Sequence, residues 1–201
     1  MSAQPMRQVR ATAGSCPRPG CRHAAAVRRI VAVAGGSTRP LLFLDVDGTL
    51  LPYGTAAPAV SEVDWSARQQ PSNPLLSGLT RSLGDRLLAL DCELRWATGW
   101  GEDANRVLAP ILGLPQLPVV ALPDYPGGDY FDDELHWKTR AVVTSAAGRS
   151  FIWIDDEIRE QDSAWVCGNH HGRALLHRVD GVLGLLDTDF TALTDWLRTS
   201  P

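Results

Sequence analysis

The chain has 201 residues, a length that suits one ordinary domain. Apolar residues make up 44% and charged residues 21%, which excludes a disordered or fibrous protein. Apolar runs such as 41–44 and 119–122 are too short to span a bilayer, which argues against a membrane protein.

Charge is distributed unevenly along the chain. Residues 1–44 contain seven arginines and no acidic residue, whereas residues 45–201 contain 12 basic and all 23 acidic residues, a net charge of −11. We expect residues 1–38 to be a basic, mostly disordered extension and residues 39–201 to form the folded domain. Such an acidic body is unlike a protein that binds nucleic acid through bulk charge.

The basic and sulfur-containing residues give two further indications. Lys138 is the only lysine among 19 basic residues, which raises the question of whether its position requires an ammonium group. Four cysteines are too few for a disulfide-rich framework, and we expect Cys16 and Cys21 to be free thiols in the tail of a cytoplasmic protein. Cys16, Cys21 and His23 could supply half of a zinc site, but no second pair of ligands follows.

From residue 40 onward, strand patterns alternate with helix patterns. Continuous apolar runs predict buried strands, and leucines at helical spacing behind capping residues predict helices. This alternation predicts an α/β fold with a doubly wound parallel sheet, in which ligands bind beyond the carboxyl ends of the strands. The predicted strands cover 41–44, 93–98, 119–122, 151–154 and 174–179, and the predicted helices cover 73–87, 102–108 (ended by Pro110), 132–147 and 188–197.

Two aspartates follow the first predicted strand. Asp45 and Asp47 lie on the same side of an extended chain, and Gly48 allows a sharp turn after them. Two carboxylates this close repel each other unless a cation lies between them or one is protonated. A calcium loop begins with the same residues, but it requires other residue types where this chain has Thr49 and Ala56.

Other polar side chains follow the later strands. Thr98 follows the second, Lys138 lies in the first turns of the helix before the fourth, and Asp155 and Asp156 end the fourth. Each of them, taken alone, is also typical of a turn, a cap or a solvated loop. Together, an acid pair, a hydroxyl, an amine and a second acid pair at one sheet edge predict a site for chemistry.

Residues 43–50, Phe-Leu-Asp-Val-Asp-Gly-Thr-Leu, resemble the first motif of the haloacid dehalogenase-like (HAD) superfamily of phosphohydrolases. Thr98, Lys138 and the pair Asp155-Asp156 resemble its second, third and fourth motifs, so the resemblance extends over residues 40–157. Within the superfamily, the chain looks like the HAD domain of bacterial RNA-repair proteins.

The resemblance implies a Mg²⁺-dependent phosphatase. Asp45 would be the nucleophile that forms an aspartyl-phosphate, and Asp47 would serve as general acid and then general base. Thr98 would donate to a phosphoryl oxygen, and Lys138 would pair with the nucleophile and the developing negative charge. The ligands implied for Mg²⁺ are Asp45, the backbone carbonyl of Asp47, and Asp155 or Asp156.

The substrate is less well defined by the sequence. The segments 51–73 and 123–133 are too short to form a sizeable cap domain, so we expect an open site, which in the superfamily tends to accompany macromolecular substrates. Phosphorylated nucleic-acid ends are the expected substrate, with Gly99 and Trp100 as substrate-binding residues. Trp100 and Trp137 could stack on a base, although core packing is an equal alternative for Trp100.

Two other interpretations remain open. The first is the same chemistry on a small metabolite or nucleotide. The second is a catalytically silent domain that binds phosphorylated partners. The complete motif set argues against silence, because a silent domain need not keep its nucleophile. Tyr53 and Asn105 are candidate rim contacts, and no obligate protein partner can be inferred.

Overall fold

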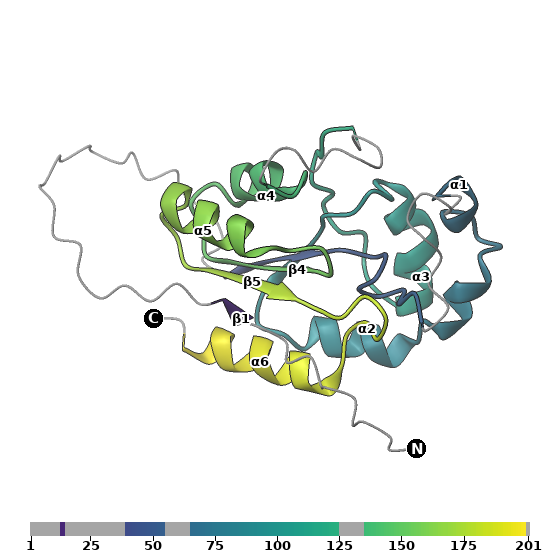
Figure 1. The fold of residues 1–201 in the computed structure, drawn as a ribbon. Helices are drawn as coiled ribbons and strands as arrows, with labels where there is room; N and C mark the ends of the chain where they lie inside the picture. Colours follow the sequence, from purple (N-terminus) through teal and green to yellow (C-terminus); the bar gives the residue numbers. More distant parts are fainter. Residues whose placement is uncertain (1–12, 15–38, 55–64, 125–134, 200–201) are drawn as a thin grey trace, which may run out of the picture.

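The computed structural model describes residues 13–14, 39–54, 65–124 and 135–199 (Figure 1). The order of the strands in its sheet is β1-β5-β4-β2-β3, in which β2 to β5 run parallel and β1 pairs antiparallel with β5. The predicted α/β class and parallel sheet are therefore confirmed. The strands are β1 (Ala13–Gly14), β2 (Leu41–Leu44), β3 (Glu93–Trp96), β4 (Phe151–Asp155) and β5 (Ala174–Arg178).

Helices lie on both faces of the sheet. Figure 1 shows α4 and α5 above it and α2 and α6 below it. Among the described residues, none of the helices combines the length and the apolar composition that a membrane span requires. The helical segments are α1 (Trp65–Arg68), η2 (Pro74–Gly78), α2 (Arg81–Leu88), η3 (Ala104–Leu108), α3 (Ala109–Leu112), α4 (Thr139–Ala146), α5 (Glu160–Asn169) and α6 (Asp187–Arg198).

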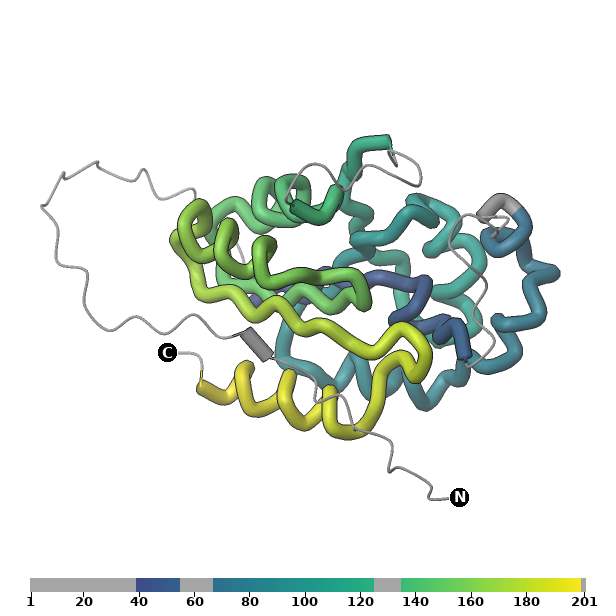
Figure 2. Tube along the Cα trace, viewed as in Figure 1, coloured from purple at the N-terminus to yellow at the C-terminus, as the bar shows by residue number. Residues whose placement is uncertain are grey.

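β2 and β4 form the centre of the sheet and are buried along their whole length. Because side chains alternate along a strand, Leu42 and Leu44 pack in the core with α2, α3 and α6, whereas Leu41 and Phe43 pack in the core with α4 and α5. A strand buried on both faces requires a continuous apolar run, and residues 41–44 provide one. The purple tube of Figure 2 follows this strand through the middle of the molecule.

The region predicted as one helix over 73–87 forms two. Asn73 caps the first, as predicted, with its Oδ1 accepting from the Leu75 N–H at 2.9 Å, but this tight helix, η2, ends at Gly78. Thr80 then caps α2 by accepting from the Leu83 N–H at 3.4 Å. The leucine spacing continues through both segments, so periodicity alone does not reveal the break.

The prediction that Pro110 ends the next helix is wrong. The Ala109 N–H bonds to the carbonyl of Ala104, five residues back, and this wider turn of η3 leads into α3. Pro110 lies in the first turn of α3, where its missing N–H costs no hydrogen bond. Gly113, in the left-handed conformation with φ 68°, ends the helix instead.

The predicted strand at 119–122 is reduced to a single parallel bridge between Val119 and Trp96. The Trp96 N–H donates to the Pro118 carbonyl at 2.9 Å, and the Val120 N–H donates to the Trp96 carbonyl at 2.8 Å. Pro118 has no N–H with which to extend the ladder, so the segment does not lengthen into a strand.

Two helices, α4 and α5, differ from what the sequence predicts. The first residue of α4 is Thr139, so Lys138 occupies the N-cap position, and the predicted start near 132 lies outside the described residues. α5 is not predicted, because its apolar residues 164–167 are consecutive in sequence instead of recurring at helical spacing.

The N-terminal extension and the cysteines are described only in part. Ala13 and Gly14 form β1. The rest of residues 1–38, including Cys16, Cys21 and His23, lies outside the described residues, so the expected disorder of this extension stays a prediction. Cys92 is a free, buried thiol. Cys167 is disulfide-bonded.

Candidate functional site

The carboxyl ends of β2, β3 and β4 meet at one edge of the sheet. The register pairs Leu44 with Trp96 on one side and with Ile154 on the other. The Asp45 N–H continues this pairing by donating to the Ile154 carbonyl at 3.1 Å, and the Ala97 N–H donates to the Leu44 carbonyl at 2.9 Å. Because the chain moves from β2 to β3 on one side and then to β4 on the other, this edge is where such sheets bind ligands.

Asp45, Lys138 and Asp155 form a buried ion-pair cluster at this edge. The Lys138 ammonium donates to Asp45 Oδ1 at 2.6 Å and to Asp155 Oδ2 at 2.9 Å. The side chains are 6%, 5% and 0% exposed, respectively. β2, the start of α4 and the end of β4 thus bring together three predicted site residues, and the chain's only lysine lies at their centre.

The charges of the cluster alter one another's protonation. Burial raises the pKa of Asp45 well above its usual range, against the opposing effect of Lys138. Burial lowers the pKa of Lys138, but Asp155 and Asp45 outweigh it, so the pKa is raised. Burial raises the pKa of Asp155, but Lys138, His136 and the Glu157 N–H together outweigh it, so the pKa is lowered. The ionised form of Asp45 is therefore the least stabilised charge, and a further cation would stabilise it.

Asp47 lies at the border between the interior and solvent, and both of its carboxylate oxygens accept hydrogen bonds. Its Oδ1 accepts from Arg68 Nε at 2.9 Å, and its Oδ2 accepts from the indole N–H of Trp100 at 2.8 Å. The Arg68 guanidinium also lies over the ring of Tyr53, 5.3 Å from its centroid. The sequence pattern around α1 carries no motif, so Arg68 was not a predicted site residue.

The loop after β3 carries Thr98, Gly99 and Trp100. Trp100 is only 3% exposed and packs in the core below the sheet, which supports the core-packing alternative for this residue. Substrate binding by Trp100 stays a prediction. Thr98 is buried, and its Oγ1 accepts from the Trp100 N–H at 3.3 Å, an interaction that does not use the hydroxyl proton. Gly99 is exposed, and its carbonyl accepts from Gln69 Nε2 at 3.1 Å. Substrate binding by Gly99 stays a prediction.

The carboxylate of Asp156 packs against two glycines. A Cβ at Gly48 would lie 2.2 Å from Asp156 Oδ2, and one at Gly181 would lie 2.5 Å from it. Gly48 also has a φ of +72°, which disfavours any other residue. Burial, together with Asp155 and Glu157, raises the pKa of Asp156 to about 7. The turn after β2 thus leaves room for Asp156 beside the ion-pair cluster.

Asp45, Asp155 and Asp156 offer carboxylate oxygens that lie within 4.8 Å of one another. Magnesium prefers such oxygen ligands. In the described part of the chain, the carboxylates at this sheet edge outnumber the two cations paired with them, Lys138 and Arg68. A divalent cation would offset the excess negative charge, so these residues fit Mg²⁺. Coordination by the Asp47 backbone carbonyl stays a prediction.

A second group, His136, Asp155 and Glu157, also has ligand atoms within 4.8 Å of one another. The Nδ1 of His136 accepts from the Lys138 N–H at 3.3 Å, which places the proton of the neutral ring on Nε2, 3.1 Å from Glu157 Oε2. A protonated nitrogen cannot bind a metal, so the three-aspartate group is the better candidate. His136 instead holds the backbone of Lys138.

Asp162, which is fully buried on α5, fixes the segment that carries Lys138. Its carboxylate accepts from the His136 N–H at 2.8 Å, the Thr139 hydroxyl at 2.5 Å and the Arg159 N–H at 2.9 Å. Hydrogen bonds to a carboxylate are strong, so Asp162 ties the start of α4 to the start of α5. Sequence reasoning missed both His136 and Asp162. The only available signal was an acidic residue in a first helical turn.

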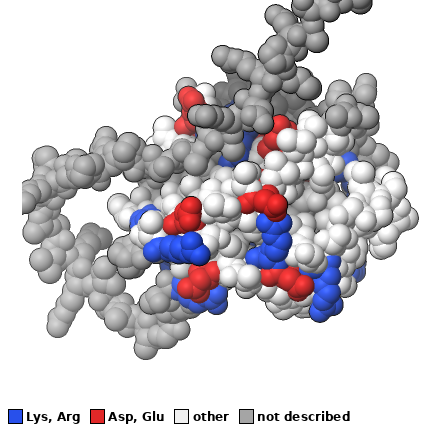
Figure 3. All heavy atoms as spheres, turned by 90° about the horizontal axis from the view of Figure 1, so that it is seen from below, with Lys and Arg blue, Asp and Glu red and all other residues white. Residues whose placement is uncertain are grey.

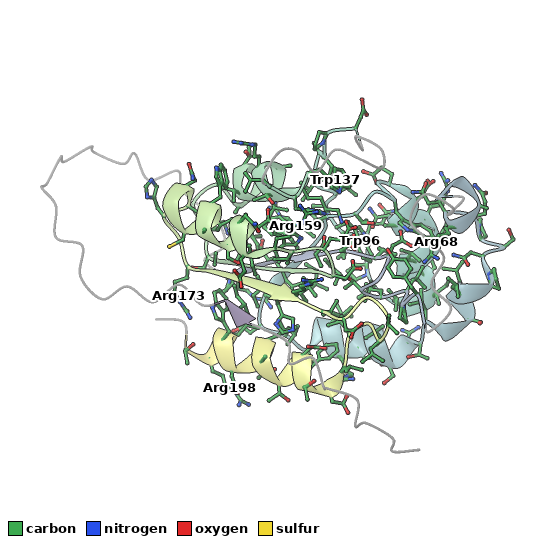
Figure 4. All side chains as sticks on the ribbon, viewed as in Figure 1. Arg68, Trp96, Trp137, Arg159, Arg173 and Arg198 are labelled. Atoms are coloured by element: carbon green, nitrogen blue, oxygen red, sulfur yellow. The ribbon has the colours of Figure 1, made fainter. Side chains whose placement is uncertain are left out.

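The structure treats two other candidate substrate contacts, Trp137 and Asn105, differently. Trp137 is half-buried, with its ring centroid 5.4 Å from the Lys138 ammonium, and lies near the start of α4 (Figure 4). Stacking of Trp137 on a base stays a prediction. Asn105 is not a rim contact, because its side chain holds the indole N–H of Trp96 and the backbone of Leu117.

We expect Mg²⁺ to stabilise the protein at pH 8. A ligand at 100 times its dissociation constant stabilises a fold by about 2.7 kcal/mol, and each kcal/mol raises the Tm of a domain this size by about 2–4 °C. Thermal melting in EDTA and in excess Mg²⁺ measures the shift. Asp156→Asn should remove most of it, and it should raise the Tm in EDTA because it removes a repelling charge.

Asp195→Asn provides the matched control for this experiment. Asp195 is an exposed aspartate on α6, 66% exposed and paired with Arg198, so its replacement should keep the full Mg²⁺ shift. An equal Mg²⁺ shift in wild type and Asp156→Asn would exclude Asp156 as a ligand.

Comparison of the chain with protein-family models, curated proteins and solved structures finds no match in any of the three. A function must therefore be inferred from the residues of the site and their geometry.

Proposed function

We propose that the protein is a Mg²⁺-dependent phosphomonoester hydrolase of the HAD type, which acts through an aspartyl-phosphate on Asp45. The observation that carries the proposal is the buried contact of the Lys138 ammonium with Asp45 and Asp155, at the ends of two adjacent parallel strands. A nucleophilic carboxylate beside a compact, fixed cation is what attack on a phosphate ester requires.

In the first step, a carboxylate oxygen of Asp45 attacks phosphorus, and the bond from phosphorus to the leaving oxygen breaks. The Lys138 ammonium stabilises the negative charge on the phosphoryl oxygens, and the Thr98 hydroxyl donates to one of them. Asp47 gives its proton to the leaving oxygen, so the product departs as a neutral alcohol. A Mg²⁺ ion held by Asp45, Asp155 and Asp156 would supply Lewis-acid neutralisation of the phosphate charge.

In the second step, water attacks the phosphorus of the aspartyl-phosphate. The bond from phosphorus to the Asp45 oxygen breaks, and Asp47, now ionised, takes the proton of the water. Inorganic phosphate leaves, and both aspartates return to their starting protonation states.

The architecture supports the proposal. A four-stranded parallel sheet in the order β5-β4-β2-β3 with helices on both faces is compatible with a doubly wound, Rossmann-like HAD core. In the described residues between β2 and β3, only the short helices α1 and η2 precede α2, which agrees with a core that lacks a sizeable cap.

Two substrate classes have support. Trp137, half-buried beside Lys138, favours phosphorylated nucleic-acid ends, because its ring could stack on a base. The surface charge favours a small metabolite or nucleotide. Seen from below, acidic and basic side chains are interspersed (Figure 3), and the pairs Arg86–Asp187 and Arg198–Asp195 join them on that side of the sheet.

Phosphate release from a panel of substrates tests the proposal. The panel contains p-nitrophenyl phosphate, sugar phosphates, mononucleotides, and oligonucleotides phosphorylated at the 3′ or 5′ end. We expect release in Mg²⁺, none in EDTA, and recovery when Mg²⁺ is restored. Faster release from an oligonucleotide than from its matching mononucleotide would identify nucleic-acid ends. If the protein binds these substrates but releases phosphate from none of them, the proposed phosphatase activity is contradicted and a silent phosphate-binding domain is favoured.

A further inference from the structure

Arg68 is a cation at the site to which the proposed chemistry assigns no role. Its Nε donates to Asp47 Oδ1 at 2.9 Å, and the guanidinium lies over the Tyr53 ring. The Arg68 and Asp47 side chains are 12% and 14% exposed, so the pair can be reached from solvent. An arginine at this position is therefore able to meet an incoming substrate.

The backbone around Arg68 is fixed, whereas its side chain is long. The buried Asn73 donates through Nδ2 to the Arg68 carbonyl at 2.8 Å, and the neighbouring Gln69 donates to the Gly99 carbonyl at 3.1 Å. The first bond fixes the end of α1 against the start of η2, and the second ties the same segment to the loop that follows β3. The backbone of Arg68 can therefore stay in place while its side chain rotates.

Asp47 has to give up a partner before it can reach a leaving oxygen, because both of its oxygens already accept hydrogen bonds. One partner, the Trp100 indole, is buried in the core and cannot move without opening it. The other partner is Arg68. The geometry therefore assigns this change of partner to the Arg68 guanidinium, which can leave Asp47.

We propose that Arg68 is a specificity-determining residue that binds a second phosphate carried by the leaving alcohol and in doing so releases Asp47. This inference rests on the proposed function, in which Asp47 faces the leaving oxygen. A group in contact with Asp47 on that side meets the alcohol and not the phosphoryl group that is transferred. A guanidinium binds phosphate with two parallel hydrogen bonds, so a second phosphate competes well with a carboxylate that holds a single Nε.

The preferred substrate is thus a phosphate monoester whose alcohol bears another phosphate. Two kinds of molecule have this chemistry: a phosphorylated polynucleotide end, in which the second group is a phosphodiester, and a small bisphosphate. The Arg68 contact is the same for both, so the experiment includes one of each.

Steady-state kinetics with matched substrates test the inference. A nucleoside 3′,5′-bisphosphate and a 3′-phosphorylated dinucleotide are compared with the corresponding nucleoside monophosphates, and p-nitrophenyl phosphate serves as the reference. Since a hydrogen bond to a charged group contributes about 1.5–3 kcal/mol, wild type should prefer at least one doubly charged substrate by ~10-fold or more in kcat/KM. Arg68→Gln should remove this preference in two ways: KM rises for the doubly charged substrates, and kcat no longer depends on a second phosphate because Asp47 is already released. Arg68→Lys should restore part of the preference.

Arg198→Gln is the matched control, because Arg198 is also paired with an aspartate but is 74% exposed on α6, far from Arg68 in the view of Figure 4. It should leave the preference unchanged. A wild-type preference near unity, or an equal preference in wild type and Arg68→Gln, would overturn the inference while turnover of p-nitrophenyl phosphate upholds the proposed function. Absence of turnover on every substrate would overturn both. If Arg68→Gln does not fold, an unreduced preference in Arg68→Lys overturns the inference.

Discussion

Asp45→Asn should abolish phosphate release from every phosphate ester while the protein stays folded. The amide has the same shape as the carboxylate and its oxygen can still accept from Lys138, which now donates to Asp45 Oδ1 at 2.6 Å. A neutral amide is nevertheless a poor nucleophile, so no aspartyl-phosphate can form. Loss of a nucleophile in enzymes of this kind lowers turnover on the order of 10⁴-fold or more.

Single-turnover kinetics and intact-protein mass after acid quenching measure this effect. Wild type should carry a transient phosphoryl adduct, and Asp45→Asn should carry none. Asp91→Asn serves as the control, because Asp91 is 86% exposed and paired with Arg39 before the amino ends of β2 and β3, at the opposite edge of the sheet from the site. Wild-type turnover in Asp45→Asn would contradict the mechanism.

The strands of the core could be predicted because each carries its own local signal. Leu41 to Leu44 form one apolar run, and a strand buried on both faces permits little else. Once these strands are parallel, their carboxyl ends must meet at one edge, so Asp45 and Asp155 are brought together by topology. The contact with Lys138 followed from the resemblance of the motifs and not from any local pattern.

The rest of the site depends on contacts that no local pattern encodes. Arg68 reaches Asp47 only because α1 folds back across the strand ends, and Asp162 reaches the start of α4 only because α5 packs beside it. Trp100 follows the predicted Thr98, but the turn directs its ring into the core and leaves only its N–H at the site. Sequence spacing places a residue near a strand end; packing decides which atoms of that residue face the ligand.

Lys138→Arg should lower turnover by at least ~10²-fold, equivalent to about 2.7 kcal/mol of transition-state stabilisation. The two carboxylates hold the ammonium at 2.6 and 2.9 Å in a space that is almost closed to solvent. A guanidinium keeps the charge, but it is planar and larger, so it cannot occupy the same point. Its charge would be displaced from the phosphoryl oxygens, and the loss should appear in kcat more than in KM.

The opposite substitution, arginine to lysine at a nearby position, is the control for the exchange of these two residue types. Arg140, two residues along the chain and exposed on α4, lies over the Trp165 ring and contacts none of the site residues described above, so Arg140→Lys should keep wild-type turnover. Thermal melting separates a chemical loss from a folding loss in Lys138→Arg. A folded Lys138→Arg variant with full turnover would show that the site needs only a positive charge, and the single lysine among 19 basic residues would then have no catalytic reason.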